Sequence, residues 1–561
     1  MATERLYSTC IVKGRKLNKK MKRRGPSTKR ELRTPRADSV DVILSGGTIL
    51  NVYSGELLRM NVVIRGDRIS YVGPLTSSTE DNTNILDVAG KVLVPGYIDP
   101  HFHPWNIYNP ISISKAACLR GTTSLFCDNL IFYMLMGVDR FEEFMEILLS
   151  LPVRLFWFCR SVPQTPMVEE DALFSVENLT RLLKNPAVQS LGEITRWPDL
   201  VRGNRKIQEM IKGAKGFKKR IDGHTAGAGL KELNELAFAG VESCHESIRP
   251  EEVLNRLRLG YYVMLRESSL RQDLRNLLKV IEKGDLLTDR LMLTTDGSSP
   301  SYYQEHGITD HVLEIAIEEG IDPVLAYRMA TINPAVYYGL DSEIGGIAPG
   351  RYADILVLKD LLHPVPELVM CKGRILAEEG VLIEGFPTVD WGKFFPQSIF
   401  PKREGYLGSE TFRIPFKGTH ITFPTIKLVN TVITRWESIE FEIQDGFLDL
   451  ASKNGFCFVA TLNKGGKWVS NGVLQGFGDG VEGLASSFNT ATEVLVIGRD
   501  PEAMCVAANR VLEMKGGIVG VEKGQVIYEF ALPLGGVTVS YTHLRAHETS
   551  LHLVCRLLLE K

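Results

Sequence analysis

Apolar residues near the start of the chain fall in short runs separated by turn residues. The runs VILSGGTIL, NVVIRG and RISYVG lie within residues 41–92, where Gly46-Gly47 and Gly66-Asp67 interrupt them. Such runs are typical of β-strands. A similar pattern returns at residues 345–376, where GGIAPG leads into ADILVL and VMCKGRIL. Two β segments around a long insertion predict one small β-sandwich domain, built from residues 39–92 and 342–385.

The residues between these segments alternate apolar runs with stretches of helical period. Strand candidates such as TTSLFCDN, RLFWFCRS and DRLMLTTD are separated by helix candidates at 140–151, 230–239, 250–259 and 270–283. This alternation indicates a parallel α/β fold, and about eight strands favour a (β/α)8 TIM-like barrel over a doubly wound sheet. We predict the barrel over residues 93–341 and, where the pattern changes again, a C-terminal α+β domain over residues 386–538.

The two ends of the chain differ from the rest. Residues 13–36 are rich in Lys and Arg with almost no acid, so residues 1–38 are expected to be a disordered leader or a misassigned start. A nucleic-acid arm or a transit peptide is the alternative. The final segment, VSYTHLRAHETSLHLVCRLLLEK, departs abruptly from the preceding pattern. Residues 539–561 are therefore expected to be a non-native read-through tail.

Composition narrows the class of protein. A net charge of −2 gives no reason to expect a polyanionic partner such as nucleic acid. The nine Cys are scattered without a CxxC pair, which fits a reducing cytoplasm. No apolar run is long enough to span a bilayer. We expect a cytoplasmic protein with a small-molecule substrate, no membrane partner, and a possible homo-oligomer because sandwich edges favour assembly.

Candidate metal ligands follow the predicted strands at the point where each strand ends. In LVPGYIDPHFH, His101 and His103 come at positions i and i+2, so both imidazoles lie on one face of an extended chain. VQSLGEI carries Glu193, and RIDGH and VESCH end in His224 and His245. The ends of parallel barrel strands converge on one mouth, where catalytic groups gather. Each His alone is more often a surface or core residue, but the joint pattern predicts a site.

Asp296 completes this pattern at the end of LMLTTD. Imidazole and carboxylate ligands suit zinc, manganese or iron alike.

The order of these motifs resembles the adenine deaminase family of the amidohydrolase superfamily. The similar stretches include LVPGYIDPHFH, RGTTSLFCD, IDGHTAGAG, GVESCHE, MLTTDG and GGIAPGRYADILVL. The resemblance continues in VLQGFGDGVEGLASSF, EVLVIGRDPEAMCVAANRVLEMKGGIV and FALPLGGV, so it runs from about residue 41 to residue 537. Features such as DPHFHPWNIYNP and TTDGSSP resemble a divergent branch of that family.

The resemblance implies a centre that holds two divalent metal ions, with manganese favoured over iron and zinc. His101 and His103 would bind the deeper ion, and His224 and His245 would bind the second. Glu193 would bridge the two ions and is counted among the catalytic residues.

The resemblance also implies the reaction, which is hydrolysis of a carbon–nitrogen bond other than a peptide bond. Adenine and water would give hypoxanthine and ammonia, a step of purine metabolism, by hydroxide attack at C6. Asp296 would bind metal, accept a proton from the attacking water and return it to the departing ammonia.

Several positions depart from the family pattern. Pro104 and Trp105 follow the first His pair where ordinary adenine deaminases continue toward an acid. Cys244 and Gly297 replace acids beside the second His pair and beside Asp296. In the C-terminal domain, residues 486–489 replace a His-Asp-Ser-His loop. These changes affect groups that shape the purine site and leave the metal ligands in place.

Weaker candidates for substrate binding are Arg266, Glu246, Trp105 and His306. Arg266 ends a predicted strand at the barrel mouth, with a structural ion pair as the alternative. Glu246 follows His245 and either orients that ligand or is solvated. Trp105 either stacks on a flat ring or packs under its loop, and His306 either lines the pocket or lies on the surface. Asp128 is expected to cap a helix.

Three functions remain open on the sequence. The first is deamination of adenine. The second is hydrolysis by the same kind of centre of another aminated heterocycle, a cyclic amide or an N-acyl group. The third is a non-catalytic barrel that binds a metabolite, although such a barrel has no need to keep metal ligands.

Overall fold

The computed structural model describes residues 42–74, 84–167, 169–281, 286–383, 385–395, 400, 406–429, 434–478 and 480–540. The chain divides into two units, residues 1–39 and 40–561. The predicted leader therefore lies outside the described residues, and of the predicted tail only Val539 and Ser540 are described. All the described residues belong to the second unit.

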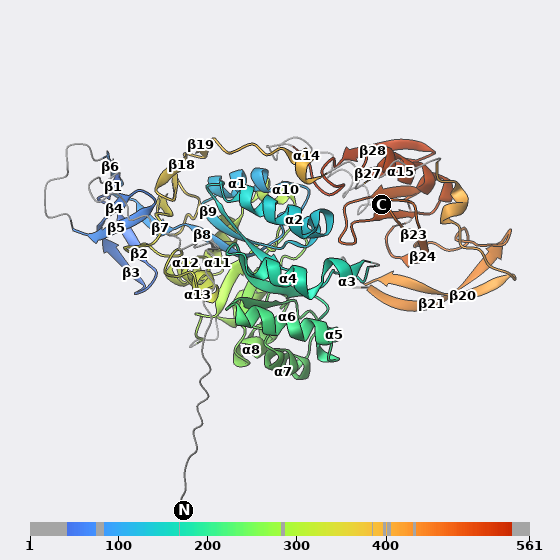
Figure 1. The fold of residues 1–561 in the computed structure, drawn as a ribbon, viewed down its shortest axis with the longest axis horizontal. Coiled ribbons are helices and arrows are strands. Elements are labelled where there is room, and N and C mark those ends of the chain that lie inside the picture. The colour runs from blue at the N-terminus through green and yellow to red at the C-terminus, as the bar shows by residue number, and fades with distance from the viewer. Residues whose placement is uncertain are drawn as a thin grey trace, which may run out of the picture. The chain divides into compact units, whose positions relative to one another are not determined.

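Eight parallel strands form the central sheet, as the sequence predicted (Figure 1). They follow one another in chain order: β8 (Tyr97–Phe102), β9 (Thr122–Cys127), β10 (Arg154–Cys159), β11 (Val188–Ile194), β12 (Arg220–Gly223), β13 (Ser243–Cys244), β14 (Tyr262–Arg266) and β15 (Leu291–Thr294). Each connection contains helix, which a parallel pairing requires. The connecting helices are α1 (Pro110–Leu119), α2 (Leu130–Leu148), α3 (Glu170–Leu173), α4 (Val176–Leu183), α5 (Trp197–Val201), α6 (Arg205–Gly216), α7 (Leu230–Ala239), α8 (Pro250–Arg258) and α9 (Leu274–Leu277).

Side chains join the two edge strands of this sheet, β8 and β15. Asp99 on β8 accepts hydrogen bonds from Thr294 Oγ1 at 2.7 Å and from Thr295 Oγ1 at 2.6 Å. Thr295 N donates to the same carboxylate at 3.1 Å, and Thr294 Oγ1 also lies 2.7 Å from the carbonyl oxygen of His101. Asp99 thus joins the two edge strands, and the barrel is nearly closed.

The barrel has an apolar interior and an apolar outer layer. Ile98, Phe126, Phe158, Met264 and Met292 point inward from five strands and form one buried cluster with Tyr337 and Tyr338. Phe158 of this layer lies 5.3 Å from His101, ring centre to ring centre, so the apolar interior borders the polar residues at the strand ends. The opposite side chains of the strands pack under the helices in a larger cluster.

Local sequence explains where several helices begin and end. Asn109 accepts from Ile111 N and Ser112 N at the start of α1, and Ser175 and Asn204 accept from the first turns of α4 and α6. The helix predicted at 270–283 is shorter than expected, because Ser268 and Arg271 pair with each other in a turn before α9. Only α9 and a 3-10 turn at Leu278–Val280 remain of it in the described residues.

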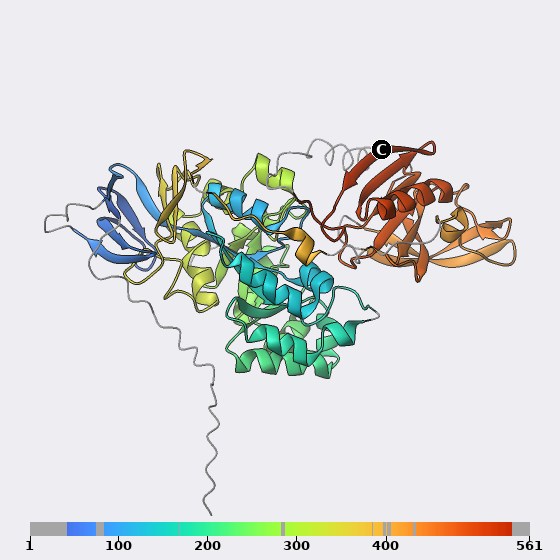
Figure 2. The ribbon, with the colours of Figure 1, turned by 45° about the horizontal axis from the view of Figure 1, so that its top comes forward.

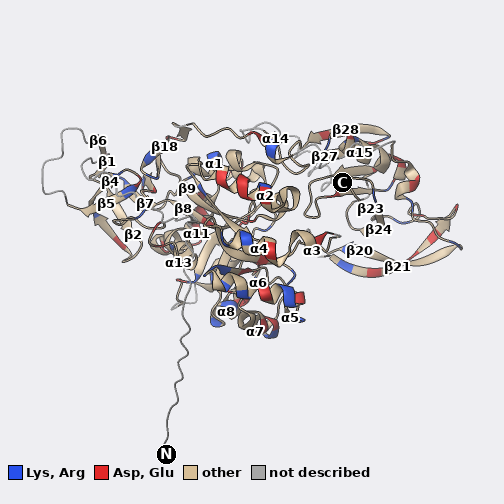
Figure 3. Ribbon diagram, in the orientation of Figure 1, with Lys and Arg blue, Asp and Glu red and all other residues tan. Residues whose placement is uncertain are grey.

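Short helices follow the last barrel strand. They are α10 (Pro300–Glu305), α11 (Thr309–Glu318), α12 (Pro323–Met329) and α13 (Ile332–Tyr337). Figure 3 shows Lys and Arg interspersed with Asp and Glu on the barrel helices α5 to α8.

Two further sheets lie outside the barrel, and one of them combines the segments on either side of it, as the sequence predicted. One has the order β5-β4-β1-β6, and the other has the order β19-β18-β17-β16-β7-β2-β3. The key contact is antiparallel pairing of β7 (Val92–Pro95) with β16 (Ile355–Leu358), which joins the two segments. The remaining strands are β1 (Val42–Ser45), β2 (Thr48–Asn51), β3 (Glu56–Arg59), β4 (Asn61–Arg65), β5 (Arg68–Gly73), β6 (Asn84–Asp87), β17 (Leu368–Cys371), β18 (Arg374–Glu378) and β19 (Val381–Leu382).

The C-terminal part is a nine-stranded sheet with one long helix, α15 (Pro501–Glu513), packed on it (Figure 2). A short helix, α14 (Trp391–Phe394), and a 3-10 turn at Ser409–Phe412 precede it. The strands are β20 (His420–Leu428), β21 (Thr434–Gln444), β22 (Phe447–Leu448), β23 (Phe456–Leu462), β24 (Val469–Gln475), β25 (Gly483–Ser486), β26 (Val494–Gly498), β27 (Gly517–Glu522) and β28 (Gln525–Ala531). The α+β class predicted for this part is confirmed.

Candidate metal centre

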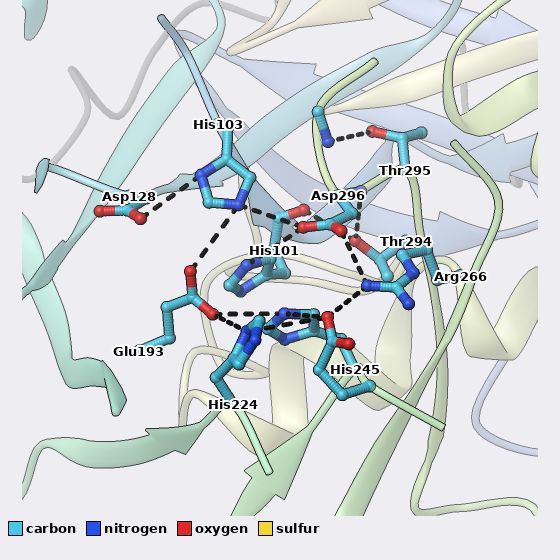
Figure 4. Close-up of polar contacts among 12 residues, drawn as sticks. His101, His103, Asp128, Glu193, His224, His245, Arg266, Thr294, Thr295 and Asp296 are labelled. Carbon is cyan, nitrogen blue, oxygen red and sulfur yellow. Dashed lines mark hydrogen bonds and ion pairs between the residues drawn. The ribbon is translucent and has the colours of Figure 1, made fainter. Parts of the chain in front are cut away.

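The His101-Phe102-His103 motif ends strand β8 with both imidazoles on one side. The two rings lie 5.1 Å apart, centre to centre, at 81° (Figure 4). Asp296, which follows β15, turns toward them: its Oδ1 lies 3.1 Å from His103 Nε2 and 3.4 Å from His101 Nε2. The three side chains therefore converge on one point, as the spacing of the motif predicted for its two histidines.

A second group forms beside the first. Glu193, near the end of β11, places Oε2 2.6 Å from His224 Nδ1 and 3.3 Å from His245 Nε2. Its other oxygen, Oε1, lies 3.9 Å from His103 Nε2, so this carboxylate faces both groups. The ring of His245 stacks on that of His101 at 3.8 Å. All six residues singled out in the sequence thus lie around one centre.

Unpartnered buried atoms in this centre fit a bound cation. Both ring nitrogens of His101, His103 Nδ1 and Asp296 Oδ1 have no hydrogen-bond partner among the described residues. Buried polar atoms normally have partners, so a group of them that face one another indicates a missing ligand. Four sets of three His, Asp or Glu side chains bring a ligand atom each within 4.8 Å of one another, and together the sets include all six residues as well as Asp128 and Glu246. Imidazole and carboxylate donors suit a divalent ion.

Arg160 is a site residue that the sequence reasoning missed. It follows β10, and its guanidinium donates to Glu193 Oε1 at 2.6 Å and to Asp128 Oδ2 at 2.7 Å. Arg160 is buried and so fixes two carboxylates of the centre. The signal was present in the sequence, because Arg160 stands at a strand end like the predicted ligands.

Asp128 has two roles in the structure. Its Oδ1 accepts from Leu130 N at 2.7 Å, which is the expected contact at the start of a helix. Its Oδ2 also lies 3.3 Å from His103 Nδ1 and binds Arg160. Asp128 therefore orients a candidate metal ligand as well as the helix.

Charges in the centre favour ionised carboxylates. Burial alone would raise the pKa of Glu193, but Arg160 and then His224 outweigh it and hold that pKa well below the usual range. Burial likewise opposes the ionised form of Asp296, and the close contact with His103, together with the charges of His245 and Arg266, outweighs it and lowers the pKa. Burial and the neighbouring His245 lower the pKa of His101, which keeps its ring neutral. Ionised carboxylates and a neutral imidazole are the forms that bind metal.

Two other histidines behave differently. Burial lowers the pKa of His103, but Asp128 and Asp296 outweigh it and raise the pKa to about 10. Burial also opposes the charged form of His245, and Glu193 and Asp296 raise its pKa to about 9. A cation between these groups would replace the proton that each of these rings holds.

Arg266 and Glu246 lie at the edge of the centre and pair with each other. Arg266 Nη1 donates to Glu246 Oε1 at 2.5 Å and to Asp296 Oδ2 at 3.0 Å. Glu246 Oε1 is 3.4 Å from His245 Nε2 and 3.7 Å from His224 Nδ1. The structure brings both weaker candidates to the site, where they already form an ion pair.

Trp105 and His306 differ in where they lie. The Trp105 ring is 4.9 Å from that of His103, and it is buried. His306 contacts Tyr302, His311 and Glu305, none of which belongs to the six-residue centre.

Comparisons with known proteins cover most of the chain. The model of the amidohydrolase family matches residues 92–376, and that of the adenine deaminase C-terminal domain matches residues 431–554. A relative from Halalkalibacterium halodurans, named "Putative adenine deaminase", is 38% identical over 504 residues, which cover 89% of this chain and 84% of the relative. A relative from Moorella thermoacetica, named adenine deaminase, is 31% identical over 507 residues, covering 89% of this chain and 85% of the relative.

The chain therefore belongs to the amidohydrolase family and is a hydrolase that acts on carbon–nitrogen bonds. Within that family its relatives are adenine deaminases, and the resemblance that the motifs predicted is confirmed. Membership in this family also implies divalent metal, in agreement with the cluster of ligands. None of the described helices has the length and apolar character that crossing a membrane requires.

Proposed function

We propose that this enzyme converts adenine and water into hypoxanthine and ammonia at a centre with two divalent metal ions, manganese being favoured. The observation that carries the proposal is the convergence of six side chains, three of which have unpartnered buried atoms, in a chain whose relatives are named adenine deaminases. His101, His103 and Asp296 would hold one ion, His224 and His245 the other, and Glu193 would face both.

A bound divalent ion supplies hydroxide near neutral pH, because it lowers the pKa of bound water from about 15.7 to about 7. The residues of the chain supply the proton transfers. Asp296 has one oxygen directed at the two histidines and the other held by Arg266 at 3.0 Å. It would accept a proton from the attacking water and give it to the departing ammonia. Arg160 would hold Glu193 in place throughout.

The surroundings of the centre favour a small, flat substrate. The ring of Trp105 lies 4.9 Å from that of His103 at 60°, so an aromatic side chain borders the place where a flat heterocycle would bind. Arg266 and Glu246 would bind the edge of such a ring. A cytoplasmic location and assembly as a homo-oligomer are further parts of this proposal.

A substrate screen tests the proposal. The protein is loaded with Mn²⁺, its metal content is measured by mass spectrometry, and ammonia release is followed with adenine, guanine, cytosine and other aminated heterocycles. We expect about two metal ions per chain and release of ammonia from adenine with equimolar hypoxanthine. Asp296→Asn, purified in the same way, controls for contaminating deaminase.

Two results would contradict the proposal. Protein that retains no metal after loading would not be a metalloenzyme. Protein that leaves adenine unchanged but hydrolyses cyclic amides or N-acyl compounds would keep the centre and change the substrate.

A further inference from the structure

The loop 104–109, directly after His103, is bound by the C-terminal part of the chain. Ile107 is buried in one apolar cluster with Phe530, Leu532 and Val539. These three residues come from the end of β28 and from the segment that follows it. A residue four positions beyond a candidate metal ligand is therefore packed into the C-terminal domain.

Hydrogen bonds fix the backbone of the same loop. The carbonyl oxygen of Ile107 accepts from Val539 N at 2.8 Å and from Thr538 Oγ1 at 2.6 Å. Asn109 Nδ2 donates to the carbonyl oxygen of Val539 at 3.0 Å. Ile107 and Thr538 thereby pair like residues of parallel strands.

The backbone of Ile107 has a conformation that this residue type avoids. Its φ is 72°, and a β-branched residue in the left-handed region is a genuine outlier. Such a conformation persists only where the surrounding structure imposes it. Here the contacts with Thr538, Val539 and the apolar cluster are the ones that impose it.

The segment 532–539 is itself anchored on both sides. Leu534 and Val537 belong to the main cluster that packs around the barrel, whereas Leu532 and Val539 belong to the cluster of Ile107. At Gly535, with φ of 64°, an added Cβ would lie 2.7 Å from Leu135 of α2. The segment therefore fits closely against the barrel and is a rigid support for the loop.

The residues on either side of Ile107 connect the loop to the metal centre. Asn106 Nδ2 donates at 2.7 Å to the carbonyl oxygen of Gly297, the residue after Asp296. Tyr108 donates its hydroxyl to the carbonyl oxygen of His103 at 3.2 Å. The position of the loop therefore determines how Trp105 is placed beside His103.

Trp105 carries a buried donor that has no partner. Its side chain is 7% exposed, and Nε1 has no hydrogen-bond partner among the described residues. A buried indole N–H normally finds an acceptor. A ring nitrogen of a flat heterocycle bound next to His103 would be such an acceptor.

We propose that Thr538 of the C-terminal domain and the adjoining Val539, the first residue of the predicted tail, hold Ile107 so that Trp105 Nε1 donates a hydrogen bond to an acceptor on the substrate. Ile107 is then a positioning residue, and Trp105 determines specificity. The clamp on the loop stands on the contacts alone, whereas the bond to a heterocycle rests on the proposed function.

Three variants test the proposal. Ile107→Gly removes the apolar anchor and relaxes the backbone, Thr538→Val removes one donor without a change of shape, and Trp105→Phe removes the N–H but keeps a ring. Val526→Ala is the control, since Val526 is 41% exposed on β28 of the same domain. Metal content is expected to stay at the wild-type value in all four.

The kinetic expectation is a rise in KM. With the substrate that the wild type turns over, Trp105→Phe and Ile107→Gly should each raise KM about tenfold, the effect of losing about one hydrogen bond. The double variant should raise KM no more than either single variant, because both act on the same bond. A purely structural role would lower the melting temperature and leave KM unchanged. An unchanged KM in both single variants, or a double variant in which the two effects multiply, would overturn the proposal.

Hydrogen exchange gives a readout that needs no substrate. The amides of residues 105–109, and that of Val539, which donates to the Ile107 carbonyl oxygen, should exchange faster in Ile107→Gly and Thr538→Val than in wild type and in Val526→Ala. Equal protection in all four proteins would refute the clamp. Should adenine fail as a substrate, this measurement still decides the clamp, so the two failures are distinguishable.

Discussion

Gly297 shows how a single residue explains a departure from the family pattern. It stands where the sequence motif of ordinary adenine deaminases has a second acid after Asp296. Its φ is 74°, and a Cβ would lie 2.8 Å from both the backbone nitrogen and the Cβ of His103. A side chain at this position would displace His103, a candidate metal ligand, so the close approach of His103 leaves no room for an acid here.

Asp296 is the residue on which the chemistry should depend most. Asp296→Asn removes the base and one anionic ligand, so turnover is expected to fall by at least about 10²- to 10⁴-fold, while circular dichroism stays that of the wild type. Asp273→Asn is a matched control, because Asp273 lies 3.4 Å from the same Arg266 and outside the six-residue centre. Near-normal turnover in Asp296→Asn would show that Asp296 does not carry the proton transfer.

Asp310 on α11 gives a pH dependence away from the metal centre. Burial raises its pKa from 3.8 to about 6, although Arg120 partly opposes the shift. The folded state thus keeps a proton that the unfolded state has already lost, and the contribution of this group to stability falls as pH rises from about 4 to about 6. Asp310→Asn stays neutral at every pH. Urea titrations should therefore show that the free energy of unfolding of the variant, relative to that of the wild type, rises over this pH range by up to about 3 kcal/mol. Asp171→Asn, at a side chain that is 99% exposed, should show no such trend.

At the scale of elements, the barrel depends on a seam made by side chains. Asp99 on β8 receives its bonds from Thr294 and Thr295 at the end of β15, where the eight-stranded sheet has its two edges. The same threonines hold the backbone just before Asp296. The seam therefore links barrel closure to the position of His101 and Asp296.

Loss of one seam hydroxyl should destabilise the whole barrel. Thr295→Val removes a donor to the buried Asp99 carboxylate and a contact with Tyr303. Hydrogen bonds to charged groups contribute about 1.5–3 kcal/mol, and we expect a loss of that size in urea unfolding. Thr434→Val, at an exposed position of β21, should have little effect. Equal stability of the two variants would show that the seam does not hold the barrel closed.

At the scale of the molecule, metal should stabilise the fold as well as the reaction. The six candidate ligands come from the ends of five strands, β8, β11, β12, β13 and β15. An ion that binds them only in the folded state adds about 4 kcal/mol at a free concentration of about 1,000 Kd. Chelation should therefore lower Tm in calorimetry, and added Mn²⁺ should restore it. A Tm that stays unchanged after mass spectrometry shows the metal removed would contradict this linkage.

The order of the elements and the positions of the six candidate ligands could be predicted from the sequence alone. Strand and helix periods repeat locally, and parallel strand ends must meet at one mouth, so the positions of His101, His103, Glu193, His224 and His245 followed from their place after apolar runs. Asp296 followed in the same way, and the motif resemblance gave each residue its expected role.

Contacts between distant segments were decided only by the tertiary structure. Arg160 reaches Glu193 and Asp128, Thr538 reaches Ile107, and Asp99 reaches Thr294, and no local period marks any of these pairs. The length of the helix near residue 274 was likewise set by a turn that the amphipathic pattern does not show. Local patterns determine which face of an element is buried. The partner of that face depends on the packing of the whole chain, which is why the candidate ligands could be placed from the sequence and the residues that support them could not.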